Sequence, residues 1–384
     1  MERFFQKVDE LQPIYKQFWK DIVAIETPSR EAERLNQLVE FIAAFAQGRG
    51  FCVVRYPDQG MGEKLCVQTA NDSDNKPITF MGHMDTVHPV GAFGPEVVRE
   101  EDGKLYGPGV VDCKGGLACA LLTMEALTAC GYAQRPLKLI MTPDEEISSP
   151  TSREFIAQQN AGAMALFNCE TGTDGKMTSA RKGICKVRVE VTGKAAHAGN
   201  NYFDGVSAIR ECCYKIPAIE QLSREGGTTY NCGVISGGTV SNAVAETCWF
   251  EVDIRALTAR EMEEAAQKVC AIAEKGTLPG AVGKATVSPR NRPPFEQNES
   301  TDWLFDRIRA AAHHYGLEEL EPQCAGGGSD VVFAALKGVP AVCSTGVCGS
   351  GTHSTREVAH IASLARRAKI MGATIQDFDR ATEY

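Results

Sequence analysis

Residues 78–85 read ITFMGHMD. An apolar run typical of a buried strand ends at His83, and Asp85 follows two places later. In an extended backbone, residues two apart point to the same face of the sheet. A histidine that binds a metal usually donates its other ring N–H to a partner such as a carboxylate. The pair therefore suggests a metal ligand, His83, and a carboxylate that fixes its tautomer, Asp85. For the pair alone, a local hydrogen bond at a strand end is the simpler alternative.

The same pattern, a polar residue just past an apolar run, recurs further along the chain. The segments 137–142, 163–168 and 340–344 read as buried strands, and Val110 and Val111 read as the end of another. The carboxyl ends of parallel strands share one edge of a sheet, so we expect the side chains that follow to converge on one crevice. These side chains are Asp112, Glu145, Glu146, Glu170 and His353.

Two patterns divide the chain. Residues 1–180 and 293–384 combine apolar strands with helical segments and predict an α/β domain with a mostly parallel mixed sheet flanked by helices. Between 181 and 292, apolar and polar residues alternate, as half-buried antiparallel strands do, and helical patterns interleave with them. We therefore expect a catalytic domain built from both ends of the chain, with a small α+β domain inserted at 181–292.

The converging side chains favour divalent metal ions. Histidines and carboxylates without a nearby thiolate cluster suit zinc best, with manganese or cobalt as alternatives. The set is large enough to hold two ions, and Asp112 could bridge them. One ion would then be completed by His83 and Glu170, and the other by Glu146 and His353.

Glu145 lies beside a predicted ligand, and we expect it to point elsewhere. It would then be free to act as general base on a metal-bound water, whose pKa the ions lower toward neutrality. The sequence therefore predicts a hydrolase.

Composition argues against several other classes of protein. The chain has 384 residues, 43% of them hydrophobic, so we expect two domains, each with its own hydrophobic core. Its net charge of −9 argues against a nucleic-acid partner. No apolar run is long enough to span a bilayer, and the first residues do not read as a signal peptide, which predicts a cytoplasmic protein without a membrane partner. The 15 cysteines are odd in number and form no C-x-x-C pair, so we expect reduced, mostly buried thiols.

Taken together, the motifs GHMDTV, GPGVVDCKGG, TPDEE, NCETG, KAAHAG and GGGSD followed by GTHS resemble the M20 family of dinuclear zinc peptidases, in particular its glutamate carboxypeptidase branch. The resemblance covers nearly the whole chain. It implies a zinc-peptidase-type catalytic domain and a ferredoxin-like lid and dimerisation domain at 181–292, with the metal ligands, the bridge and the base assigned as above.

The resemblance also implies roles for residues outside the metal set. His197, in KAAHAG, would help to stabilise the oxyanion, working in the partner chain of a homodimer. The other positions are expected to bind the substrate or its free carboxylate, with backbone N–H groups of the glycine loop contributing. They are Asn242, Arg255, Arg292, Gly327 and Gly328.

We therefore expect an enzyme that cleaves an amide bond next to a free carboxylate and releases a C-terminal amino acid, glutamate as the best guess, from a small peptide or N-acyl amino acid. Glu170 supports this, because glutamate at that position goes with carboxypeptidases and deacylases of the family. A deacylase of the acetylornithine or succinyl-diaminopimelate type, a di- or tripeptidase, and a catalytically silent binding protein are the alternatives. Cys113 is interpreted as a buried bystander, and His88 as a surface or helix residue.

Overall fold

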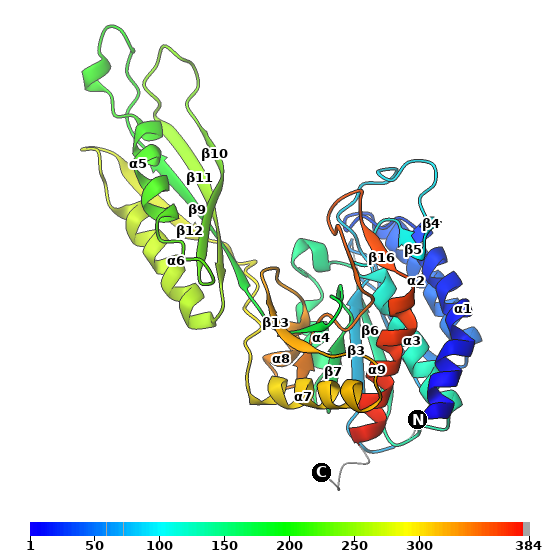
Figure 1. Ribbon diagram of the computed structural model, residues 1–384. Helices are drawn as coiled ribbons and strands as arrows, with labels where there is room; N and C mark the ends of the chain where they lie inside the picture. Colours follow the sequence, from blue (N-terminus) through cyan, green and yellow to red (C-terminus); the bar gives the residue numbers. More distant parts are fainter. Residues whose placement is uncertain (59, 72, 379–384) are drawn as a thin grey trace. The chain divides into compact units, whose positions relative to one another are not determined.

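The computed structural model describes residues 1–58, 60–71 and 73–378. The chain forms two compact units (Figure 1), and each is described separately below. The second unit comprises Ala180–Glu296 and Cys324–Ser329, and the first unit comprises the remaining segments.

The short segment Cys324–Ser329 corrects the domain assignment made from the sequence, which placed it in the catalytic domain. The backbone N–H of Lys182 donates to the carbonyl of Ala325 at 3.0 Å, and Arg181 Nη1 donates to the carbonyl of Gly327 at 3.1 Å. These bonds attach the segment to the second unit, which also extends past residue 292 to Glu296.

The first unit is built on a six-stranded mixed sheet. Its strand order is β1-β2-β6-β3-β7-β14. Strands β6, β3, β7 and β14 run parallel, and β2 runs antiparallel to its neighbours β1 and β6. The strands are β1 (Cys52–Tyr56), β2 (Lys64–Gln68), β3 (Ile78–His83), β6 (Leu137–Thr142), β7 (Ala165–Asn168) and β14 (Ala341–Val342).

Helices flank this sheet, as the sequence predicted. Helix α3 (Lys114–Ala129) packs on β3 and β6, and α1 (Glu2–Ala24) and α9 (Ala362–Phe378) pack on α3. Because α3 is covered on both sides, most of its residues are apolar and buried. The remaining helices are α2 (Ala32–Gly48), which packs on β1 and β2, α4 (Arg153–Gln159), α7 (Glu299–His314), α8 (Val331–Ala335) and the 3₁₀ turn η1 (Glu145–Ile147).

Two smaller sheets complete the connections. One has the order β15-β16-β5-β4, and the other pairs β13 with β8. Their strands are β4 (Arg99–Glu101), β5 (Lys104–Tyr106), β8 (Lys176–Arg181), β13 (Glu321–Ala325), β15 (Gly349–Ser350) and β16 (Val358–His360).

The second unit has the connectivity βαββαβ and the antiparallel strand order β10-β11-β9-β12, which is the ferredoxin-like arrangement. Both helices pack on one face of the sheet (Figure 1). Alternate residues of β9 and β11 are buried against them, so the alternation seen in the sequence is confirmed. The elements are β9 (Gly183–Thr192), η2 (Tyr202–Asp204), α5 (Ala208–Glu220), β10 (Thr229–Gly237), β11 (Thr247–Ala256), α6 (Ala259–Glu274) and β12 (Val282–Val287).

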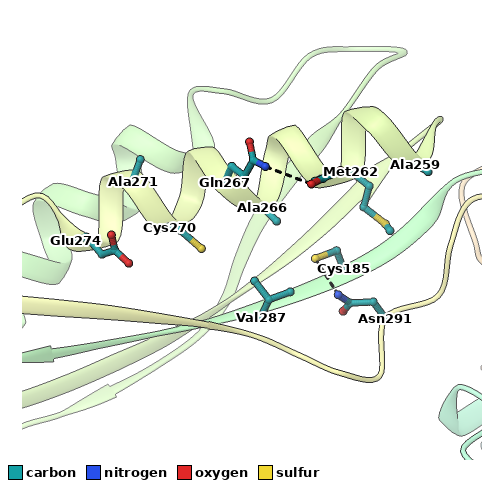
Figure 2. Close-up of a pocket in the computed structure, with 11 residues that line it drawn as sticks. Cys185, Ala259, Met262, Ala266, Gln267, Cys270, Ala271, Glu274, Val287 and Asn291 are labelled. Carbon is teal, nitrogen blue, oxygen red and sulfur yellow. Dashed lines mark hydrogen bonds between the residues drawn. The ribbon is translucent and has the colours of Figure 1, made fainter.

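A cavity of about 560 Å³ lies in the second unit, where α6 passes over the edge of the sheet (Figure 2). Its lining is mainly apolar and includes Met262, Ala266, Cys270 and Val287. None of the candidate site residues lines it. Among the described helices, none is long and apolar enough to cross a membrane.

Candidate metal centre

His83 is fixed by its place at the end of β3. Strands β3 and β6 are parallel and in register at His83 and Thr142, so the segments after both strands begin at the same edge of the sheet. The His83 Nδ1 atom lies 3.0 Å from the backbone oxygen of Asp85 and 3.3 Å from Asp85 Oδ1. These acceptors favour a proton on Nδ1, which leaves Nε2 to face Asp112 Oδ1 at 3.1 Å.

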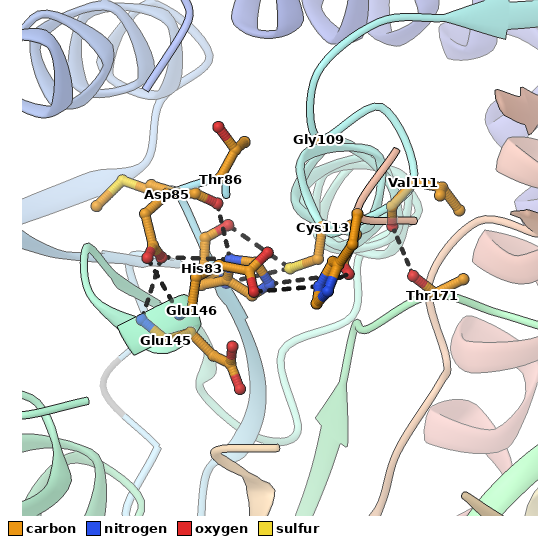
Figure 3. Close-up of polar contacts among 12 residues, drawn as sticks. His83, Asp85, Thr86, Gly109, Val111, Cys113, Glu145, Glu146 and Thr171 are labelled. Carbon is orange, nitrogen blue, oxygen red and sulfur yellow. Dashed lines mark hydrogen bonds and ion pairs between the residues drawn. The ribbon is translucent and has the colours of Figure 1, made fainter. Parts of the chain in front are cut away.

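The Asp85 carboxylate also holds the turn that carries Glu145 and Glu146. Asp85 Oδ1 accepts the backbone N–H of Glu145 and Oδ2 accepts that of Glu146, each at 3.1 Å (Figure 3). Asp144 braces the far side of the same turn, accepting the Thr151 N–H at 2.8 Å. One buried carboxylate thus fixes a histidine and two glutamates relative to one another.

Asp112 lies between two histidines. Its Oδ1 faces His83, and its Oδ2 lies 3.5 Å from His353 Nε2, which is also 3.2 Å from Glu146 Oε2. The potential ligand atoms therefore form two groups, and within each group all the atoms lie within 4.8 Å of one another. One group comes from His83, Asp112 and Glu170, and the other comes from Asp112, Glu146 and His353.

These groups fit divalent metal ions. Ligand atoms that surround one zinc ion with bonds of about 2 Å are separated by roughly 3–4 Å. Small side-chain movements would therefore bring the atoms of either group to bonding distance from one ion. Both groups contain imidazole and carboxylate ligands, which suit zinc, manganese or cobalt. Asp112 belongs to both groups, and Glu145 belongs to neither.

The charges of the cluster are strongly coupled. Although burial alone would raise the pKa of Asp112, hydrogen bonds to His353 and His83 hold it well below its usual range. Burial raises the pKa of Glu146 to about 8, and hydrogen bonds to Asp112 and Glu146 raise that of His353 to about 10. Either bound protons or a metal cation can neutralise the negative charge of these carboxylates. Binding of a divalent ion therefore releases protons from the cluster.

Cys113 lies against His83 and contacts its backbone. Its Sγ accepts the His83 N–H at 3.1 Å. Burial raises the pKa of the Cys113 thiol to about 12, so it stays protonated at neutral pH. The thiol therefore supports the strand end that carries His83.

The segment before Asp112 differs from the strand that the sequence predicted. Val110 and Val111 are fully buried but belong to a turn before α3, not to a strand. The backbone N–H groups of this turn bond to the carboxylate of Glu357, a residue that the sequence analysis did not single out. His88 was read as a surface or helix residue; it is buried in a loop, with Nε2 3.2 Å from the same carboxylate.

The remaining candidate residues belong to the second unit. The backbone brings two of them together: His197 forms a bridge with Ala243, and the Ala198 N–H donates to the carbonyl of Asn242 at 2.9 Å. His197 Nδ1 accepts the N–H groups of Gly199 and Asn200, each at 3.1 Å. In the neutral ring the proton is then on Nε2, so the exposed His197 offers a hydrogen-bond donor.

The candidate arginines differ in their surroundings. Arg255 Nε lies 2.6 Å from Asp253 Oδ1, so an acidic neighbour on the same strand already binds it. Arg292 is buried, pairs with Ile184 through the backbone, and lies against the glycine loop. A Cβ at Gly328 would lie 2.8 Å from Arg292 Cδ, which explains why a glycine occupies this position.

The chain matches the family model described as peptidase family M20/M25/M40 over residues 79–377. It is 30% identical to carboxypeptidase G2 from Pseudomonas sp. (strain RS-16), over 97% of this chain and 91% of the relative. It is also 30% identical to acetylornithine deacetylase from Myxococcus xanthus, over 64% of this chain and 68% of the relative.

Among solved structures, a tripeptidase from Staphylococcus aureus subsp. aureus Mu50 superposes with a TM-score of 0.82 and 21% identity, covering 96% of this chain and 99% of that one. This likeness supports the fold. The family match spans the metal centre and the whole of the second unit, so the protein belongs to peptidase family M20 and is a metallopeptidase of that family.

Proposed function

We propose that this metallopeptidase hydrolyses an amide bond next to a free carboxylate and releases a C-terminal amino acid, glutamate as the first choice, from a small peptide or N-acyl amino acid. The main support is the pair of ligand groups that share Asp112, with Glu145 on the adjoining turn. The similarity to carboxypeptidase G2 along nearly the whole chain supports a carboxypeptidase.

Two divalent ions, zinc by preference, would be held by the two groups of ligand atoms. His83 and Glu170 complete one site, Glu146 and His353 complete the other, and Asp112 is common to both. When bound, such ions polarise the scissile carbonyl and lower the pKa of the attacking water.

Glu145 is the proposed general base. It is buried beside Glu146, and its backbone is held by Asp85. Its carboxylate would take a proton from the attacking water and deliver it to the nitrogen of the leaving amino acid, so that the amine departs as a neutral group. A base fixed by a rigid turn loses little freedom when the substrate binds.

The second unit is proposed to serve as lid and dimerisation domain. His197 would donate its Nε2–H to the carbonyl oxygen as that oxygen gains negative charge, in the site of the partner chain of a homodimer. The free proton on Nε2, inferred from the two backbone donors at Nδ1, supports this role.

Substrate recognition is assigned to the second unit as well. Arg292 would hold the free carboxylate, with backbone N–H groups of Gly327 and Gly328 beside it. Asn242 would bind near His197, and Arg255 would contribute less because Asp253 already binds it.

We place the enzyme in the cytoplasm. All 15 cysteines are free thiols, most of them buried, as expected in a reducing compartment.

The alternative with a specific observation behind it is a deacylase, since the Myxococcus xanthus relative is an acetylornithine deacetylase. The two functions differ in the amino acid that leaves. A panel of N-acyl amino acids and dipeptides, each offered as free acid and as C-terminal amide, separates them by kcat/KM. We expect the highest value for a C-terminal glutamate with a free carboxylate. Preference for acetylornithine would favour the deacylase, and no turnover in the presence of zinc would favour a silent binding protein.

A further inference from the structure

Glu357 is a buried carboxylate that lies four residues after His353, just before β16, and is only 1% exposed. Its Oε1 accepts the backbone N–H groups of Val111 and Asp112, each at 3.0 Å. Its Oε2 accepts the N–H of Gly109 at 3.0 Å. Three amides of one turn therefore converge on a single side chain from a distant part of the chain.

His88 supplies a fourth contact. Its Nε2 lies 3.2 Å from Glu357 Oε2, and its ring packs edge-on against Phe93 with centroids 5.0 Å apart. An ionised carboxylate only accepts hydrogen bonds, so the His88 Nε2 carries the proton in this contact. A carboxylate can accept about four hydrogen bonds, and the four donors around the two oxygens of Glu357 supply them.

The turn that Glu357 holds carries Asp112, the residue common to both groups of ligand atoms. Fixing the N–H of Asp112 fixes the direction in which its side chain leaves the backbone. That side chain faces His83 at 3.1 Å on one side and His353 at 3.5 Å on the other, so a small rotation would spoil both contacts.

We infer that Glu357, supported by His88, is a positioning residue of the metal centre: it orients Asp112 and so sets the affinity of both metal sites together. This inference rests on the proposed role of Asp112 as the shared ligand. It explains why a carboxylate is buried in this place, because a neutral amide could not satisfy all the N–H groups that converge here.

The test is metal affinity, measured without substrate. Purified full-length protein is stripped of metal and titrated with Co²⁺ in the presence of a competing chelator, and the visible absorption of the bound ion reports ligand geometry. The variant Glu357→Gln keeps the size of the side chain but replaces one acceptor oxygen with an NH₂ group. Loss of such an outer-shell partner typically weakens metal binding by about 10–100-fold.

Glu211→Gln is the matched control. Glu211 is also a fully buried carboxylate that accepts two backbone N–H groups, from Thr277 and Leu278 at 2.8 Å, but it lies in the second unit. We expect Glu211→Gln to lower the melting temperature and leave Co²⁺ affinity unchanged. Glu357→Gln should instead weaken both sites in parallel and alter the absorption spectrum, and His88→Phe should do the same to a smaller extent.

Unchanged affinity at both sites in Glu357→Gln, beside a wild type that binds two ions, overturns the inference alone. A wild type that binds no Co²⁺ overturns the proposed function and the role of Glu357 with it. If Glu357→Gln yields no folded protein, His88→Phe decides: a parallel loss at both sites supports the inference, and wild-type affinity overturns it.

Discussion

The Asp85 carboxylate joins the metal centre to the turn of the proposed base, and Asp85→Asn tests that connection. The N–H groups of Glu145 and Glu146 bond to different oxygens of Asp85. Asparagine offers only one acceptor oxygen, so one of these N–H groups must face an NH₂ group. A buried donor without an acceptor costs about 1–3 kcal/mol, which lowers the free energy of unfolding by that amount.

The effect on function should exceed the effect on metal binding. His83 Nδ1 keeps its 3.0 Å hydrogen bond to the backbone oxygen of Asp85, so its tautomer is retained. We therefore expect metal affinity to fall by about tenfold, the lower end of what loss of such a partner causes. Displacement of Glu145 by about 1 Å can cost about 10²-fold in rate, so kcat/KM at saturating metal should fall by about that factor.

Asp144→Asn is the control for this experiment. Asp144 is a buried aspartate that braces the same turn, but it bonds to Thr151 and Ser152. It should lose a similar amount of stability while metal affinity stays at the wild-type value. The assays are thermal melting, metal titration and kcat/KM on the best substrate of the panel. Wild-type metal affinity and wild-type kcat/KM in Asp85→Asn, with only the melting temperature lowered, would refute the reasoning.

Four further outcomes are expected. Glu145→Ala should lose several orders of magnitude in kcat and keep both metals, as measured by metal analysis; loss of metal would mean that it is a ligand. Asp112→Ala should lower occupancy at both sites and His353→Ala chiefly at one; two full equivalents in Asp112→Ala would exclude a shared ligand. Arg292→Ala should raise KM and erase the preference for a free acid over its amide, so unchanged discrimination would assign the carboxylate to another group. His197→Ala and Glu145→Ala, unfolded and refolded together, should recover roughly a quarter of wild-type activity per site if His197 acts in the partner chain; a mixture as inactive as its parents, while wild type refolds, would exclude that.

The central strands of the main sheet could be predicted because β3, β6 and β7 are short, mainly apolar runs that end in a polar residue. The run 78–83 is fully buried as β3, and 137–142 is buried as β6 except at Lys138. Parallel pairing then placed the ends of both strands at one edge of the sheet, which was enough to bring His83 near the turn of Glu145. The strands of the second unit could be predicted equally well from their alternating apolar and polar residues, because helices cover one face of the sheet and not the other.

Val110 and Val111 show where sequence reasoning fails. Two buried valines read as a strand because strand residues are commonly apolar and β-branched. Their N–H groups must still be satisfied without a neighbouring strand. The Val110 N–H donates to the carbonyl of Gly107 within the turn, and the Val111 N–H donates to a carboxylate more than 200 residues further along the chain. Nothing local to either segment predicts that contact.

The segment 324–329 was misassigned for a similar reason. The sequence analysis included it in the catalytic domain with the rest of 293–384, but hydrogen bonds from Arg181 and Lys182 hold it in the second unit. Such bonds depend on how the chain returns in space, which composition does not record. Short connecting segments between domains are therefore less predictable than the strands and helices they join.

The contact between Glu357 and the Asp112 turn also has a consequence for the order of folding. The two segments are separated by 245 residues, so the turn cannot take its final form until residue 357 has left the ribosome. Early folding can build local helices and strand pairs, whereas contacts of such long range form late. A chain that ends before Glu357 therefore lacks this contact, and its metal centre stays unfinished until synthesis has passed that residue.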